Sequence, residues 1–378
     1  MSNKALGERL KEARELTGLS LIEAAERLGF ASYQTLSKIE SGEREVKASE
    51  LFLFTKTYFC NLSSLLGEAE LRPSFSPLWR NAPRGNKKKE VEARIFDLCE
   101  KYHLLETLLG LQKEEKFKFL DIDIEDIRSD SDIDTLADNS GNLLGLGNRP
   151  AFTLQKVLEQ KYGVKIIFNR LSDLGSAATM VHPEFGAVVV INADEAPWRR
   201  NYDLAHELFH LITWKIISPG DLKDSEFYKD IETKAERFAS TFLLPETEVK
   251  SEIFSRREGQ RGLSHSDLID IAREFGVSTI AFLYRLKNLR LLNGKTVNSL
   301  LKDEELSRLD KHNRGKDWEE KPESERFYLL AIRCLRKGLI SRGKFTELVD
   351  IDRSEIDEFI KSRGLMETEG VLVEVMAP

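Results

Sequence analysis

The stretch that decides the fold is NYDLAHELFHLITW, residues 201–214, which contains the order His-Glu-x-x-His. On a helix, positions four residues apart lie one above the other on the same face. His206 and His210 can therefore hold one zinc ion through their imidazole nitrogens, with Glu207 turned toward a water molecule rather than the metal. The motif predicts the zinc helix of a metallopeptidase with Glu207 as general base.

A catalytic zinc ion takes three protein ligands and keeps one position open, so a carboxylate is expected on a following helix. The segment IETKAERFASTFLLP supplies Glu232 and, one helical turn later, Glu236. We assign Glu232 as the third zinc ligand and Glu236 as a hydrogen-bond acceptor that orients a ligating histidine. The reverse assignment of the two glutamates stays open on sequence alone.

Short runs rich in β-branched residues precede this helix and predict strands at 164–169 and 186–192, with a third at 176–182. Helical spacing of apolar residues predicts helices at 88–112 and at 198–214, and helical patterns continue beyond them. We therefore expect an α+β, mostly helical chain with a small sheet in a zincin-like metallopeptidase domain and a helical C-terminal region.

The first 62 residues show short helical patterns with tight turns. Ser20 is a good N-cap for a helix that Gly29 ends, and Ser32 can cap the next helix, which stops at Gly42. Two short helices joined by a glycine-containing turn form a helix-turn-helix unit, whose second helix can enter the DNA major groove. The N-terminal domain is therefore expected to be all-α.

This unit resembles the Cro- and repressor-like DNA-binding family over roughly residues 5–62, on Ala25, Gly29, Leu36 and the closing Ile39-Glu-x-Gly turn. The resemblance implies contact with an operator in double-stranded DNA through five side chains, namely Ser32, Tyr33, Gln34, Ser37 and Lys38. Two features depart from a DNA-binding pattern: Leu21 stands where the family usually has a polar residue, and acidic and basic side chains balance in this segment. A module that docks protein or forms a homodimer stays open.

LAHELFH followed by AERFASTFLLP resembles the ImmA/IrrE family of metallopeptidases, over about residues 90–292. The resemblance implies zinc as cofactor and a protein substrate, a transcriptional repressor or a partner toxin or regulator. Phe209 stands where the family usually has glycine, and Glu236 replaces an asparagine or aspartate. Phe209 either narrows the cleft or packs in the core.

Domain boundaries follow from these motifs and from a proline-rich stretch after residue 71. We expect a helix-turn-helix domain at 1–66, a linker at 67–89, the metallopeptidase domain at 90–292 and a helical extension at 293–378. An ordered crossing arm at 72–86 stays open as the alternative to a linker. The three scattered cysteines, the charged N-terminus and the lack of an apolar run indicate a cytoplasmic protein without a membrane partner. Because the net charge of the chain is -7, any contact with DNA has to come from a local basic surface.

Two functions fit this organisation. The first is an enzyme, a DNA-binding regulatory zinc endopeptidase that acts in a stress, mobile-element or defence operon. The second is a transcriptional repressor or antitoxin that uses the peptidase fold as a sensor or docking domain. The intact HExxH motif favours the enzyme, because a scaffold does not need the base Glu207.

Overall fold

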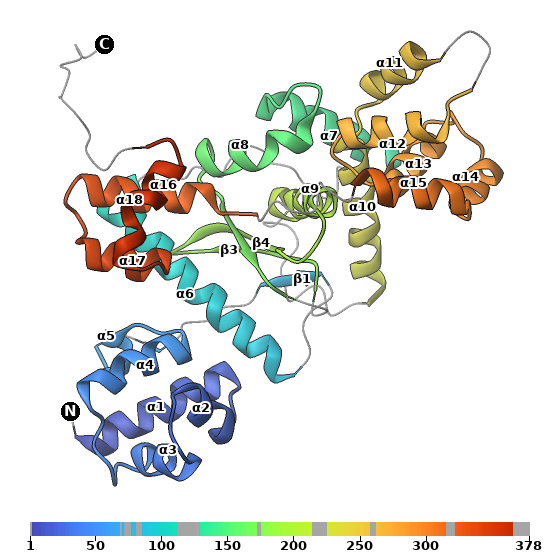
Figure 1. Cartoon of the computed structure of the whole chain (residues 1–378). Helices are drawn as coiled ribbons and strands as arrows, with labels where there is room; N and C mark the ends of the chain where they lie inside the picture. The colour runs from blue at the N-terminus through green and yellow to red at the C-terminus, as the bar shows by residue number, and fades with distance from the viewer. Residues whose placement is uncertain are drawn as a thin grey trace, which may run out of the picture.

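A computed structural model describes the following residues of the chain: 2–68, 70–71, 77–80, 85–111, 127, 129–171, 175–213, 225–257, 262–314 and 322–365. Helices dominate and one small sheet lies among them, which confirms the predicted α+β class (Figure 1). Among the described helices, none combines the length and the apolar character needed to cross a lipid bilayer.

The N-terminal domain is all-α, as predicted. It consists of α1 (Asn3–Thr17), α2 (Leu21–Arg27), α3 (Tyr33–Glu40), α4 (Ala48–Tyr58) and α5 (Leu62–Leu65). Ser20 and Glu23 form a capping box at the start of α2, and Ser32 caps α3. Gly29 has a φ of 74° between these helices, a conformation that costs other residues free energy. The turn therefore sets the crossing of α2 and α3.

A buried ion pair fixes α1 against the end of α3. The Arg14 guanidinium donates to both carboxylate oxygens of Glu40, at 2.7 and 3.0 Å, and to the Leu19 carbonyl at 2.9 Å. The two helices approach closely, since a side chain on Gly7 would meet the Ile39 carbonyl at 2.5 Å. Both features hold α3 in one orientation on the domain.

The sheet has the strand order β1-β3-β4-β2. Its strands are β1 (Leu78–Arg80), β2 (Lys165–Asn169), β3 (Ala177–His182) and β4 (Gly186–Asn192). β2 and β4 are parallel, whereas β3 is antiparallel to both β4 and β1. The last three strands lie where the sequence predicts them. The edge strand β1 falls in the range 67–89, for which the sequence predicts no strand.

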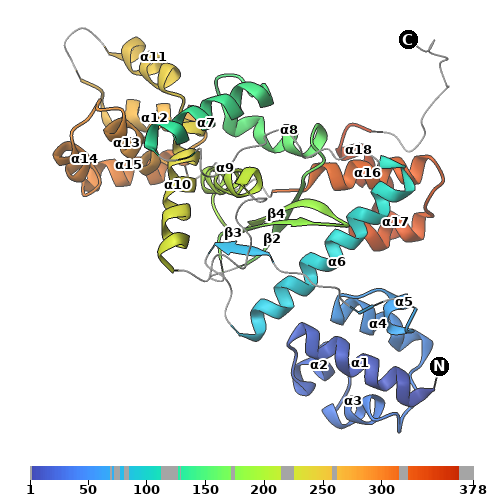
Figure 2. The same cartoon turned by 180° about the vertical axis from the view of Figure 1, so that it is seen from behind.

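Side chains alternate across the sheet and bury both of its faces. Ala178, Met180 and Val190 pack on one face, against α6 (Asn86–Leu108). Ala177, Val189 and Ile191 pack on the other face, in the core that contains the HExxH helix, α9 (Pro197–Thr213). The two views agree that the sheet lies between α6 and α9 (Figures 1 and 2).

Further helices extend the core around α9. They are α7 (Asp130–Leu144), η3 (Pro150–Phe152), α8 (Leu154–Gln160), α10 (Ser225–Leu243), α11 (Glu246–Arg256), α12 (His265–Glu274), α13 (Thr279–Asn288), α14 (Gly294–Leu300) and α15 (Glu304–Arg314). The C-terminal elements α16 (Glu325–Arg336), α17 (Arg342–Val349), η6 (Arg353–Glu355) and α18 (Ile356–Ser362) form a separate core with the end of α6.

A buried charge cluster joins this C-terminal core to the sheet. Glu106 at the end of α6 accepts hydrogen bonds from Lys165 of β2 and from Arg326 of α16, each at 2.6 Å. All three side chains are almost fully buried. Lys165 also donates to the Phe185 carbonyl at 2.7 Å. The single carboxylate of Glu106 therefore compensates the charges of two buried cations, Lys165 and Arg326.

We expect Glu106→Gln to lower the free energy of unfolding by about 3–5 kcal/mol, because it leaves two buried cations without their counter-charge. Urea denaturation followed by circular dichroism measures this loss. Glu347→Gln is the matched control, since Glu347 pairs with Lys344 on the exposed surface of α17 and should contribute about 0–1 kcal/mol. Equal midpoints for the two variants would contradict the role of Glu106 in attaching the C-terminal core.

Candidate metal centre

The helix α9 carries the HExxH motif into the interior. Leu204, Leu208 and Leu211 are buried on one side of it and anchor it in the core. His206, Glu207 and His210 are also buried, with 0%, 1% and 3% of their surface exposed. Polar groups buried this deeply are costly unless they have partners. The geometry around the motif therefore has to supply those partners.

Two imidazoles and one carboxylate converge on a single point. The Nε2 atoms of His206 and His210 lie 3.1 Å apart. The carboxylate of Glu232 on α10 lies 3.4 Å from the first Nε2 and 3.3 Å from the second. Among the described residues, these three are the group whose ligand atoms lie close enough to share an ion.

Aromatic packing between the two helices brings Glu232 to this position. Phe209, next to His210, is fully buried and contacts Phe238 of α10 with ring centroids 5.6 Å apart. Phe238 in turn stacks on Phe242. Of the two roles open for Phe209 from sequence, the structure shows the packing one: its ring joins α9 to α10 in the core.

Glu236 contacts the far side of the first imidazole. Its carboxylate lies 3.9 Å from Nδ1 of His206 and accepts a hydrogen bond from the Tyr202 hydroxyl at 2.9 Å. Tyr202 lies one turn before His206 on α9, so helix α9 itself positions Glu236. The two glutamates therefore have different surroundings: Glu232 faces both Nε2 atoms and Glu236 faces one Nδ1 atom.

Glu207 lies beside this cluster and is held by the sheet. The Thr179 hydroxyl of β3 donates to one oxygen of Glu207 at 2.6 Å. The other oxygen has no hydrogen-bond partner among the described residues. Burial raises the pKa of Glu207 to about 7, although the charge of His210 and the Thr179 hydrogen bond oppose this rise. One carboxylate oxygen thus remains available to accept a proton.

The pKa of Glu232 shifts in the opposite direction. Burial raises it, but hydrogen bonds from His206 and His210 lower it by more, so the pKa lies below its usual range. The two carboxyl groups therefore differ: the pKa of half-buried Glu232, beside two imidazoles, lies below its usual range, whereas burial raises the pKa of Glu207 to about 7.

The donor set fits a zinc ion by its chemistry and by its distances. Zinc bonds of about 2.0–2.1 Å at tetrahedral angles place neighbouring donor atoms about 3.3–3.4 Å apart. The three separations of 3.1, 3.3 and 3.4 Å match that spacing. Two imidazoles and one carboxylate leave a fourth tetrahedral position for a reacting molecule.

The side chains expected to contact DNA lie together on α3. Tyr33, Gln34, Ser37 and Lys38 are exposed. Ser32 is partly buried, and its hydroxyl accepts from the Gln34 amide as the helix cap. Both views place α3 on the side of its domain away from α6 and the sheet (Figures 1 and 2).

Other histidines and tyrosines of this part of the chain lie in different surroundings. His182 stacks on Phe185 and accepts hydrogen bonds from backbone amides, and His265 lies near Asp303. Tyr202 contacts the cluster through the carboxylate of Glu236. Thr179 escaped sequence reasoning, because nothing local in SAATMVH shows which strand position faces α9.

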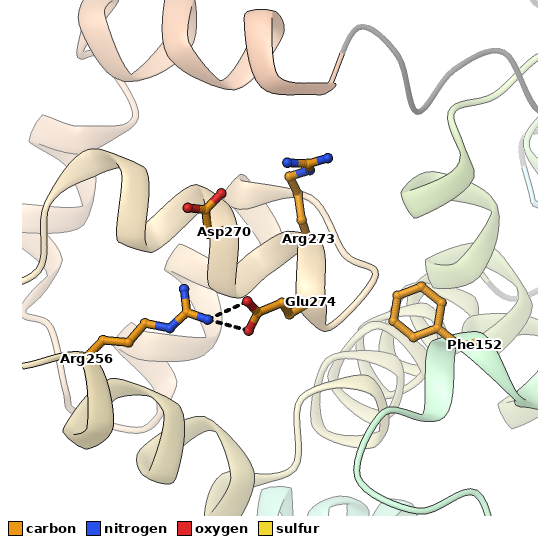
Figure 3. A pocket seen from close by; sticks show the side chains of 5 residues that line it. All are labelled: Phe152, Arg256, Asp270, Arg273 and Glu274. Carbon is orange, nitrogen blue, oxygen red and sulfur yellow. Dashed lines mark hydrogen bonds and ion pairs between the residues drawn. The ribbon is translucent and has the colours of Figure 1, made fainter.

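A cavity of about 430 Å³ lies elsewhere, lined by Phe152, Arg256, Asp270, Arg273 and Glu274. The Arg256 guanidinium donates to both oxygens of Glu274, so these two charges compensate each other (Figure 3). Its lining contains none of the side chains that converge at the centre. The cavity therefore adds no residue to the centre.

Models of known protein families match two separate parts of the chain. Residues 10–65 match a helix-turn-helix family model, so the class is that of a DNA-binding regulator with a second domain. Residues 159–287 match the peptidase-family model of the IrrE N-terminal-like domain. The chain therefore carries both domains, in the order that the sequence predicts.

Other comparisons are weaker. No curated protein matches the chain. Among solved structures, a Mycobacterium tuberculosis transcriptional regulator matches at 17% identity with a TM-score of 0.31, over 50% of this chain and 52% of that one. The chain thus spans about half the length of the structure it matches.

We expect the purified protein to bind about one zinc ion per chain. His206→Ala and His210→Ala should each abolish binding, because two ligands remain. Glu232→Ala should weaken it strongly, whereas Glu236→Ala should weaken it by about 10- to 100-fold, as for groups that orient a ligand. Elemental analysis and chelator competition measure these effects. A larger loss for Glu236→Ala than for Glu232→Ala would invert the assignment of the two glutamates.

Proposed function

We propose that the chain is a DNA-binding regulatory zinc endopeptidase that cleaves a transcriptional repressor or a partner regulator. The observation that carries this proposal is the convergence of His206, His210 and Glu232 at zinc-ligand spacing beside a buried Glu207. The match to a peptidase-family domain supports it. The helix-turn-helix domain in the same chain supports action at an operator.

In this proposal His206, His210 and Glu232 hold the ion. When bound, zinc polarises the scissile carbonyl and lowers the pKa of water. Glu207 accepts a proton from the attacking water through the oxygen that Thr179 leaves unbonded, and delivers it to the leaving amine. Thr179 fixes the rotamer of that carboxylate. The Glu236 carboxylate, held by Tyr202, lies 3.9 Å from Nδ1 of His206, and its charge favours the ring orientation in which Nε2 faces the ion.

The proposal assigns operator binding to residues 1–66 and the chemistry to residues 90–292. Residues 67–89 are a linker between them, and residues 293–378 are a helical extension. Ser32, Tyr33, Gln34, Ser37 and Lys38 form the DNA-facing set. A second function, a repressor or antitoxin that senses or docks through the peptidase domain, draws support from the exposure of α3. The exposed face of α3 can meet DNA without any contribution from the residues of the metal centre.

The double variant Gln34→Ala/Lys38→Ala should lose DNA binding and keep its fold and zinc. Each good base contact contributes about 1–3 kcal/mol. Gel shifts with duplex DNA from upstream of the chain's own gene provide the measurement, and Lys11→Ala, an exposed lysine on α1, is the control. Unchanged affinity of the double variant would remove α3 as the DNA-reading helix.

Glu207→Gln should keep zinc and DNA binding but lose peptide cleavage by about 100- to 10,000-fold, because it removes the general base. A cell carrying this variant should fail to induce the regulated operon, with the uncleaved regulator persisting on an immunoblot. Glu358→Gln, on the exposed face of α18, is the matched control. Normal induction with Glu207→Gln would leave the sensor or docking function in place of the enzyme.

A further inference from the structure

The edge strand β1 lies outside the residues that match the peptidase-family model. It pairs with β3, the strand whose Thr179 hydroxyl contacts Glu207. Leu78, Trp79 and Arg80 pair antiparallel with Thr179, Ala178 and Ala177 of β3. The family match begins only at residue 159. The sheet of the matched domain therefore has β3 as its own edge, and a segment that follows the DNA-binding domain occupies that edge.

The pairing register places β1 against the reactive side of the centre. Leu78 is the direct partner of Thr179, whose hydroxyl contacts Glu207. Directly opposite residues of an antiparallel pair point to the same face of the sheet. Leu78 thus faces the same side as the base, and the backbone of β1 lies one strand spacing, about 4.8 Å, outside β3.

A second contact comes from the helix that carries Glu232. The Tyr228 hydroxyl on α10 donates to the Trp79 main-chain carbonyl at 3.5 Å. Tyr228 precedes Glu232 by one helical turn, so both point from the same face of α10. The peptide backbone of β1 therefore lies between β3 and α10, the two elements that contribute Thr179 and Glu232 to the centre (Figure 2).

One side chain anchors this short strand. Trp79 is buried among Val91, Ile95 and Phe96, and its indole N–H donates to Glu92 of α6 at 2.9 Å. Pro77, immediately before β1, has no amide hydrogen and cannot extend the pairing by a further bond. Within the described residues the pairing with β3 is only three residues long, so it offers few backbone hydrogen bonds and another extended peptide can replace it.

We propose that the outer edge of β3 is where an extended polypeptide substrate pairs by its backbone, and that β1 is an internal strand occupying that edge until it is displaced. The inference rests on the proposed peptidase function. Pairing through the backbone recognises an unfolded or loop segment of a protein, with little dependence on its side chains. The linker strand then competes directly with substrate.

A cross-strand disulfide tests this competition. Arg80 and Ala177 are direct partners, and opposite residues of an antiparallel pair have Cα atoms about 4.5–5.5 Å apart, within disulfide range. The three natural cysteines are buried, which limits interference. Arg80→Cys/Ala177→Cys is made in the full chain carrying Glu207→Gln, so that binding is measured without cleavage. Each single cysteine variant is the control.

The probe is a fluorescein-labelled peptide with the sequence of residues 76–82, SPLWRNA, and the readout is fluorescence anisotropy. The oxidised double variant should bind it at least about tenfold more weakly than the reduced form, which retains exchange at the edge. Trp79→Ala, which removes the anchor, should bind it more tightly than its parent. Equal affinity of the oxidised and reduced forms would overturn the proposal.

Cleavage of casein by the zinc-loaded double variant with Glu207 intact separates this inference from the proposed function. Cleavage that appears only after reduction supports both. Redox-dependent peptide binding without cleavage in any form supports the occupied edge and overturns the peptidase function. Equal cleavage by oxidised and reduced protein supports the peptidase function and overturns the occupied edge.

Discussion

The peptidase domain depends on one geometric constraint: two imidazole nitrogens and one carboxylate must lie within about 3.4 Å of one another in the interior. His206 and His210 meet this constraint within one helical turn, but Glu232 comes from another helix. The Phe209–Phe238 contact and the burial of α9 on the sheet hold those two helices in register. A shift of α10 by one turn would replace Glu232 by Glu236 or Tyr228, so core packing sets the chemistry.

Helix α6 connects this centre to the other parts of the chain. Near its start, Glu90 pairs with Arg27 of α2, and Asn86 lies against Gly18 at the end of α1. Glu92, half a turn later, holds the indole of Trp79, and Glu106 at the far end holds the C-terminal core. The Arg27–Glu90 pair is partly exposed and weak, about 0–1 kcal/mol. Asn61 also donates to Glu100 at 3.0 Å, and Arg94 lies over the Phe59 ring, so several contacts along α6 hold the DNA-binding domain next to the anchor of β1.

Features that depend on short sequence spacing could be predicted, and features that depend on topology could not. The i, i+4 spacing of His206 and His210 and the caps Ser20 and Ser32 follow from helix geometry alone. Glu232 could be proposed because a catalytic zinc ion needs a third protein ligand and the next helical segment supplies a carboxylate. Thr179 could not be found, because its contact with Glu207 depends on how β3 crosses α9. β1 could not be found because three residues carry no periodicity and their partner lies about a hundred residues away.

A bare strand edge beside a hydrolytic centre is a hazard for a regulator. Unpaired backbone groups attract any extended chain, which promotes aggregation and unselective cleavage. In our proposal, β1 satisfies the edge at the high local concentration of a strand from the same molecule, and it leaves when a competing peptide binds the edge more strongly. Because the chain continues from α5 through β1 to α6, the segment that covers the edge is also the connection to the DNA-binding domain. In the proposed function, the strand that covers this edge therefore lies in the connection between the domain that would bind the operator and the domain that would carry the chemistry.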